Sequence, residues 1–163
     1  AYDVVLIDTG AGLSHEVAVP LGLADGILLV TTPDDVAVGD TVKTAQLADR
    51  IDGEVIGAIL NRVTKHTDVA EISDRLGFKL LAVVPDDQEA TTDKPLVLNT
   101  PDSRAASAFQ QLSESLEALF FRGATVGELE TVLEEEWFLD EEELEEEDEE
   151  DEEESGGVFG LFG

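Results

Sequence analysis

The triplet Asp8-Thr9-Gly10 has residue types that indicate chemistry, because it directly follows the apolar run Val4-Val5-Leu6-Ile7. Two unrelated chemistries use such a triplet. In aspartic proteases, two Asp-Thr-Gly loops bring carboxylates together to activate water. In the second chemistry, a carboxylate at the end of a buried strand holds a magnesium-bound water beside a nucleotide. A purely structural alternative is a strand that ends in a tight turn capped by Asp8.

Apolar runs alternate with amphipathic segments along the rest of the chain. The runs at 4–7, 27–30, 55–60 and 80–84 are apolar throughout and predict buried strands. Helical spacing and end signals predict helices at 13–23 (broken by Pro20), 34–52, 68–76 and 103–121, with shorter helices at 88–93 and 126–133. The buried stripe of the longest helix would contain Ala106, Phe109, Leu112, Leu116, Leu119 and Phe120.

This alternation decides against the protease. Fully apolar strands that alternate with helices indicate an α/β fold, in which a parallel sheet carries helices on both faces. A protease built around paired Asp-Thr-Gly loops would consist almost wholly of strands. In an open parallel sheet, ligands bind at the carboxyl ends of the strands. Asp8 is expected at that position, and the small residues that follow it leave room for a close backbone approach.

The charge is strongly acidic and unevenly distributed. The chain has 39 acidic and 9 basic residues, a net charge of −30. Residues 134–154 contain 17 of the acids, which leaves 22 acids against all 9 bases in the rest of the chain, a net charge of −13. A surface of this sign repels phosphate backbones, so we expect no direct nucleic-acid binding.

Two interpretations of the acidic body stay open. One is an ordinary solvated surface that keeps the protein soluble. The other is adaptation to molar salt inside a halophilic archaeon, because at about 1 M salt the screening length falls to about 3 Å and like charges stop repelling one another. The small number of lysines and the many aspartates favour the second.

Five motifs, in order, resemble the deviant Walker ATPases of the MinD/ParA group, and the MinD type most of all. They are DTGAGL (8–13), ADGILLVTTPDDVAVGDTVK (24–43), GAILNRV (57–63), LLAVVPDD (80–87) and KPLVLNTPDSRAASAF (94–109). The resemblance covers about residues 2–122. It implies a P-loop NTPase-like fold and a switch ATPase that binds ATP and magnesium, forms a nucleotide-dependent homodimer, and positions a regulatory or cargo protein.

The resemblance also implies roles for individual residues. Asp8 would orient the magnesium-bound water, and Gly12 would bring its backbone N–H to the terminal phosphate. Asn61 would hydrogen-bond the adenine edge. The remaining base-binding positions would be Arg62, Pro85 and Asp86.

One departure from the family pattern matters as much as the matches. The family's glycine-rich phosphate loop with its lysines has no counterpart in this sequence; Lys43-Thr44 lies in a predicted helix and lacks the glycines. We therefore expect residues 1–123 to be the C-terminal part of the ATPase domain, with its N-terminal half missing, and expect no ATP hydrolysis by this chain alone. The alternative is a non-hydrolysing scaffold that binds partners through its acidic tail.

The end of the chain predicts three further segments: a connecting helix at 124–133, a disordered acidic tail at 134–154, and a short apolar motif at 155–163. Val158, Phe159, Leu161 and Phe162 resemble the end of a membrane-docking tail, although the motif has no basic residue. The absence of cysteine fits a reducing compartment. We expect a cytoplasmic protein, with weak peripheral membrane contact as one option and a frayed end or protein-docking peptide as the other.

Overall fold

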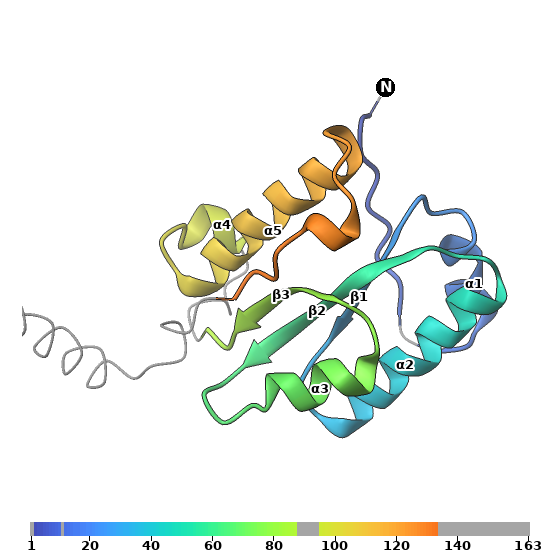
Figure 1. The fold of residues 1–163 in the computed structure, drawn as a ribbon, viewed down its shortest axis with the longest axis horizontal. Helices are drawn as coiled ribbons and strands as arrows, with labels where there is room; N and C mark the ends of the chain where they lie inside the picture. Colours follow the sequence, from blue (N-terminus) through green and yellow to red (C-terminus); the bar gives the residue numbers. More distant parts are fainter. Residues whose placement is uncertain (1, 11, 88–94, 134–163) are drawn as a thin grey trace, which may run out of the picture. The chain divides into compact units, whose positions relative to one another are not determined.

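The computed structural model describes residues 2–10, 12–87 and 95–133. Its sheet has three parallel strands in the order β1-β2-β3 (Figure 1). They span Ile27–Thr31 (β1), Val55–Val63 (β2) and Leu80–Pro85 (β3). The strands predicted at 27–30, 55–60 and 80–84 and the parallel sheet are therefore confirmed.

Helices cover both faces of this sheet. On one face, α2 (Asp35–Arg50) packs against β1 and β2, and α3 (Val69–Leu76) packs against α2. On the other face, α5 (Arg104–Phe121) packs against β3 and carries the short α4 (Leu96–Asn99) beside it (Figure 1). This arrangement buries every residue of β3, which explains why its sequence is apolar throughout.

The helix ends follow from local hydrogen bonds. The side chain of Asp68 accepts from the Glu71 N–H at 2.9 Å and caps α3, and Gly77 ends that helix with a φ of 70°. Ser103 caps α5 by accepting from the Ala106 N–H at 3.2 Å. The helix α1 (His15–Leu21) is shorter than predicted and passes Pro20 by one residue.

The predicted first strand is wrong. Residues 4–7 form no strand, and their four side chains are between 55% and 90% exposed. A strand needs a neighbouring backbone to complete its hydrogen bonds. A groove of about 690 Å³ lies between this segment and the start of β1, so the neighbour that the apolar run requires is not among the described residues.

The predicted stripe of α5 is correct only in part. Ala106 and Leu112 are buried, but Phe109 and Phe120 are exposed. The helix instead turns its small residues Ala105 and Ala108 to the core. Small side chains let the helix lie close to the sheet, which leaves the bulky phenylalanines at its margins.

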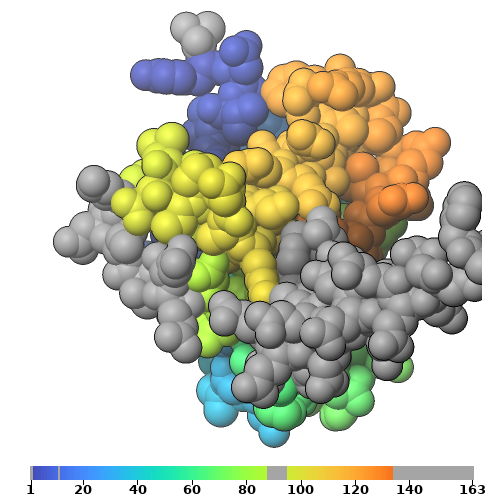
Figure 2. Space-filling model, turned by 90° about the vertical axis from the view of Figure 1, so that its left-hand side faces the viewer, coloured from blue at the N-terminus to red at the C-terminus, as the bar shows by residue number. Residues whose placement is uncertain are grey.

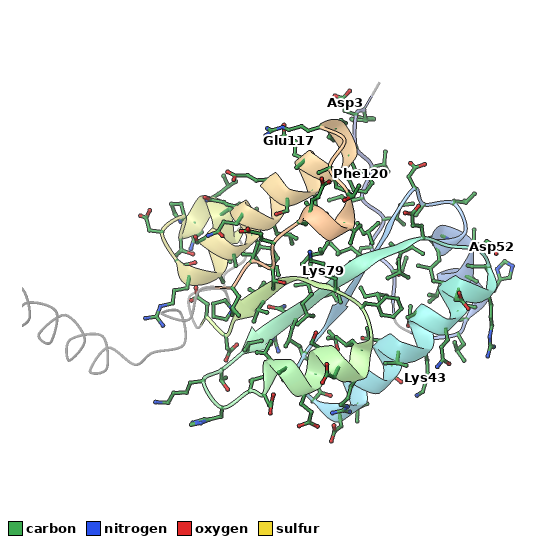
Figure 3. All side chains as sticks on the ribbon, viewed as in Figure 1. Asp3, Lys43, Asp52, Lys79, Glu117 and Phe120 are labelled. Carbon is green, nitrogen blue, oxygen red and sulfur yellow. The ribbon has the colours of Figure 1, made fainter. Side chains whose placement is uncertain are left out.

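The predicted helix at 124–133 is also wrong. The structure has one 3-10 turn, η2 (Val126–Glu128), after which Val132 forms a parallel bridge to Ala82 of β3. The Val132 N–H donates to the Leu81 carbonyl at 2.9 Å, and the Val83 N–H donates to the Val132 carbonyl at 2.8 Å. The Lys79 ammonium, labelled in Figure 3, donates to the carbonyls of Val126 and Leu129. These bonds cover the β3 edge, and an edge contact outweighs helix propensity here.

Residues 1–133 form one compact unit. The short helix predicted at 88–93, the acidic tail and the apolar motif all lie outside the described residues. Within the described part of the chain, no helix has the length and hydropathy needed to cross a membrane.

Candidate functional site

The carboxyl end of β2 is irregular at Asn61 and Arg62. The pairing register with β3 shifts between Leu60 and Val63, and Arg62 has a φ of 58°. The Asn61 side-chain oxygen accepts from the Arg62 N–H at 2.9 Å. A bulge of this kind bends the strand and re-aims its side chains. A non-glycine residue in the left-handed region is strained, and such strain concentrates at functional sites.

The loop after β3 is bonded directly to this bulge. Val63 pairs with Pro85, and the Asp86 N–H donates to the Val63 carbonyl at 2.8 Å. The structure therefore brings Asn61, Arg62, Pro85 and Asp86 to one edge of the sheet. Asn61 is half-buried, Arg62 and Asp86 are exposed, and Pro85 is buried. The edge offers amide, guanidinium and carboxylate groups beside a rigid apolar residue.

The end of β1 contributes a third loop at the same edge, because parallel strands end together. The Thr32 hydroxyl donates to one oxygen of Asp34 at 2.5 Å, and the Ala37 N–H donates to the other at 2.9 Å. These two bonds hold the pKa of Asp34 below its ordinary value, and the bond from Thr32 has the larger effect. Asp34 is thus the N-cap of α2, and Asp35 beside it is paired with Arg75 at 2.7 Å.

The other two predicted site residues lie elsewhere. Asp8 is exposed and lines the groove beside the start of β1. Gly12 has a φ of 117°, and its N–H donates to the Thr44 hydroxyl in the second half of α2 at 3.3 Å. Their contacts in the described residues are with these neighbours and not with the Asn61–Asp86 edge. The structure does not bring the two sets together.

Sequence reasoning missed two features of this site. One is the strain at Arg62, which no residue type signals in advance. The other is the Thr32–Asp34 bond, although the order Thr-Thr-Pro-Asp before an apolar helix does signal a cap.

An edge that is mainly acidic offers little to a triphosphate. Its charged groups on the three loops are mainly carboxylates, with Arg62 and Lys65 as the bases after β2. In the described ranges, no three metal-ligating side chains gather into a group that could hold an ion. The described residues of this edge therefore present amide, guanidinium and carboxylate groups and no group of three metal ligands.

Known proteins show what this chain is similar to. No family model matches the chain. An uncharacterized ATP-binding protein of Methanocaldococcus jannaschii is 31% identical over 121 residues, which are 70% of this chain and 46% of that protein. Other relatives are septum site-determining proteins of the MinD type. This chain is therefore similar to part of an ATP-binding protein and to part of MinD-type proteins.

Solved MinD structures share the fold. The cell division ATPase MinD of Pyrococcus furiosus is 31% identical with a TM-score of 0.65, and the match covers 72% of this chain and 53% of that one. A MinD of Pyrococcus horikoshii, complexed with Mg-ADP, is 30% identical with a TM-score of 0.55, over 61% of this chain and 44% of that one. The chain spans about half the length of the MinD-type proteins that it matches.

Proposed function

We propose that this chain supplies the base-binding part of a MinD-like switch ATPase that positions the cell-division site or other cellular machinery. The observation that carries the proposal is the bond between the Asp86 N–H and the Val63 carbonyl, which joins the strained Asn61–Arg62 bulge to the Pro85–Asp86 loop. A relative named as an ATP-binding protein and a MinD complexed with Mg-ADP support a nucleotide as the ligand.

Each residue has a proposed part. The Asn61 amide carries both a donor and an acceptor, which suits the Watson–Crick edge of adenine. Arg62 and Asp86 are exposed and would border the base, and the buried Pro85 would support the loop that lies along it. Asp8 and Gly12 would serve the magnesium-bound water and the terminal phosphate only once the remaining part of the domain is in place, because their present neighbours lie outside this edge.

The whole enzyme would then bind ATP and magnesium, form a homodimer while nucleotide is bound, and change its contacts with a regulatory or cargo protein on hydrolysis. We propose a cytoplasmic location with weak peripheral contact at the membrane through Val158, Phe159, Leu161 and Phe162. Liposome flotation in high salt, with and without residues 155–163, tests that contact. Equal flotation of the two chains would contradict it.

A non-hydrolysing scaffold is the second candidate, and the observation that favours it is the dense acidic run at 134–154, which contains 17 of the 39 acids. A scaffold of this kind would bind partners through the acidic run at 134–154. It predicts partner binding that is independent of nucleotide, whereas the switch ATPase predicts partner binding that depends on ATP.

Equilibrium binding of adenosine to this chain tests the base site without the phosphates. We expect millimolar-range binding to the unmodified chain and at least fivefold weaker binding to Asn61→Ala. The matched control is Gln110→Ala, which removes an exposed amide from α5 and should bind adenosine unchanged. Equal binding by the Asn61 and Gln110 variants would overturn the assignment of the base site. Magnesium-dependent phosphate release by the unmodified chain would contradict its expected inactivity.

A further inference from the structure

We propose that Lys79 is a positioning residue for the Pro85–Asp86 loop at the carboxyl end of β3. It acts through residues 124–133, here called the strap, which it holds along the edge of β3 that faces away from β2. The proposal rests on the proposed function only for the ligand of that loop. The strap and its bonds to β3 rest on the observations that follow.

The Lys79 ammonium bonds to two backbone carbonyls of the strap. It donates to the Val126 carbonyl at 3.1 Å and to the Leu129 carbonyl, 47 and 50 residues further along the chain (Figure 3). The regular structure of the strap is one 3-10 turn, η2, so these carbonyls lack the partners that an α-helix would give them. A charged donor makes a stronger hydrogen bond than a neutral one. One side chain therefore satisfies two carbonyls that the conformation of the strap leaves without helical partners.

The second half of the strap pairs with β3 as a short additional strand would. The Thr131 hydroxyl donates to the Leu80 carbonyl at 2.8 Å. The Val132 N–H donates to the Leu81 carbonyl at 2.9 Å, and the Val83 N–H donates to the Val132 carbonyl at 2.8 Å. Figure 1 shows the strap (orange) returning along β3. The strand β3 is therefore hydrogen-bonded on both of its edges, to β2 on one side and to the strap on the other.

The last bond between the strap and β3 lies next to the base loop. Val83 is two residues before Pro85, and the Asp86 N–H donates to the Val63 carbonyl on the other edge at 2.8 Å. Because alternate residues of a strand face opposite edges, the next donor on the strap side would be Pro85, which has no N–H. The bond at Val83 is therefore the nearest support that the loop has on the strap side.

Loss of this support should reach the loop. A strand bonded on one edge only opens to water more readily than a strand bonded on both. Without the strap, the end of β3 is held by β2 alone, where the register already shifts between Leu60 and Val63. Figure 2 shows the end of β3 and the start of its loop (lime green) at the surface beside α4 (yellow), so water is close to this end. We expect the loop to open more often when the strap is loose.

Lys79 is too far from the loop to act on it by contact. It precedes β3 and the loop follows that strand, so roughly 20 Å of chain separates them at about 3.3 Å per residue. Any effect of Lys79 on the loop therefore passes through the strap and β3. A competing explanation is that Lys79 only adds stability to the whole chain, and the experiment separates the two.

The experiment compares amide hydrogen exchange in the unmodified chain and in Lys79→Met, which keeps a long side chain but removes the charge and the donors. Leu129 and Val132 are buried and still hold the strap to the core, so we expect the variant to fold with a looser strap. Exchange should become at least tenfold faster at Val132 and Asp86. At the buried Leu60 in the middle of β2, it should change less than threefold.

Two further variants make the test specific. Lys79→Arg keeps a charged donor and should restore slow exchange at Asp86. Lys43→Met removes an exposed ammonium in α2 that pairs with Asp40 at 2.8 Å, and it controls for the loss of one positive charge. It should exchange like the unmodified chain.

Titration with adenosine then tests the ligand separately. We expect at least threefold weaker adenosine binding by Lys79→Met and unchanged binding by Lys43→Met. Exchange is measured without adenosine, so the two results are independent. An unmodified chain that binds no adenosine would contradict the proposed function, while the exchange at Asp86 would still decide the role of Lys79.

Three results would overturn the proposal. One is unchanged exchange at Asp86 in Lys79→Met, which would make the loop independent of the strap. Another is equal acceleration at Asp86 and Leu60, which would mean a general loss of stability. The third is acceleration at Asp86 by Lys43→Met that is as large as that by Lys79→Met.

Discussion

The backbone N–H of Asp86 donates to the carbonyl of Val63 at 2.8 Å, and this bond ties the loop after β3 to the bulge that ends β2. Two short sequence motifs, at 57–63 and 80–87, thereby become one rigid edge. Bonds between backbone groups hold this edge, so its geometry persists when individual side chains are exchanged. Single side-chain substitutions at this edge can therefore change ligand binding without changing the fold.

The strained backbone at Arg62 predicts that a glycine there raises the stability of the chain but weakens adenosine binding. A non-glycine residue in the left-handed region costs about 1–3 kcal/mol, and glycine recovers most of this after its own entropy cost of about 0.5–1 kcal/mol. Arg62→Gly should raise the free energy of unfolding by about 1 kcal/mol and weaken adenosine binding. Chemical denaturation and adenosine titration measure the two effects.

Asp52 is the matched control for that substitution, since it is the other non-glycine residue in the described ranges with a positive φ, 57°, and it lies outside the site. Asp tolerates this conformation better, so Asp52→Gly should stabilise by only a few tenths of a kcal/mol. It should leave adenosine binding unchanged. A destabilised Arg62→Gly chain would contradict the account of the strain.

Gly57 is predicted to be indispensable for the sheet. Its φ is 153°, and a Cβ there would lie 2.7 Å from Cγ of Leu81 and 2.9 Å from the carbonyl oxygen of Lys79. Gly57→Ala should lower the free energy of unfolding by about 2–5 kcal/mol, from the strained backbone and the overlap together.

The control for Gly57 is Gly39, a helical position in α2 where a Cβ meets nothing within 4 Å. Gly39→Ala should instead stabilise the chain by about 0.5–1 kcal/mol. Thermal and urea unfolding of the two variants measures the contrast. Similar stability changes in the two variants would show that β2 and β3 do not approach as closely as the structure has them.

The cap of α2 predicts a pH dependence with a definite sign. The bonds from Thr32 and Ala37 lower the pKa of Asp34 from 3.8, so its ionised form stabilises the folded state. That stabilisation is complete well above pH 4 and is lost as the pH falls through the lowered folded-state pKa. The stability difference between the unmodified chain and Asp34→Ala should be constant near neutrality and shrink below pH 3.8. A difference that stays the same from pH 7 to pH 2 would refute it.

The acidic body predicts salt dependence. If the net charge of −13 in the first 133 residues is adapted to molar salt, dialysis into dilute buffer should unfold the chain, because screening is lost and the carboxylates repel one another. Circular dichroism across a KCl series measures this. If the chain is fully folded in dilute buffer, the halophilic interpretation is wrong. The acidic residues then form an ordinary solvated surface.

The sequence was sufficient for the elements that are stabilised locally. The apolar runs of β1, β2 and β3 and the caps at Asp68 and Gly77 are short-range signals, and each gave the right element. The sequence was insufficient where a contact with residues far along the chain decides which element forms. Residues 4–7 have strand composition but no paired neighbour, and Val132 leaves a predicted helix to bond with Leu81 and Val83.

The candidate site shows the same division. The resemblance placed Asn61, Arg62, Pro85 and Asp86 on neighbouring strand ends, and the parallel register brings them together. Asp8 and Gly12 depend on a segment that has no strand partner in the described residues, so their proposed roles stay predictions. The φ of Arg62 is set by the register between two strands, which no single-residue preference encodes.

The most direct test of the central claim is an NMR titration of this chain with adenosine, followed by mapping of the amide shifts. We expect the largest shifts at Asn61, Arg62, Val63 and Asp86, and none of comparable size at residues 3–9. Shifts concentrated in the groove beside β1, or spread evenly over the surface, would contradict a base site at the carboxyl ends of β2 and β3.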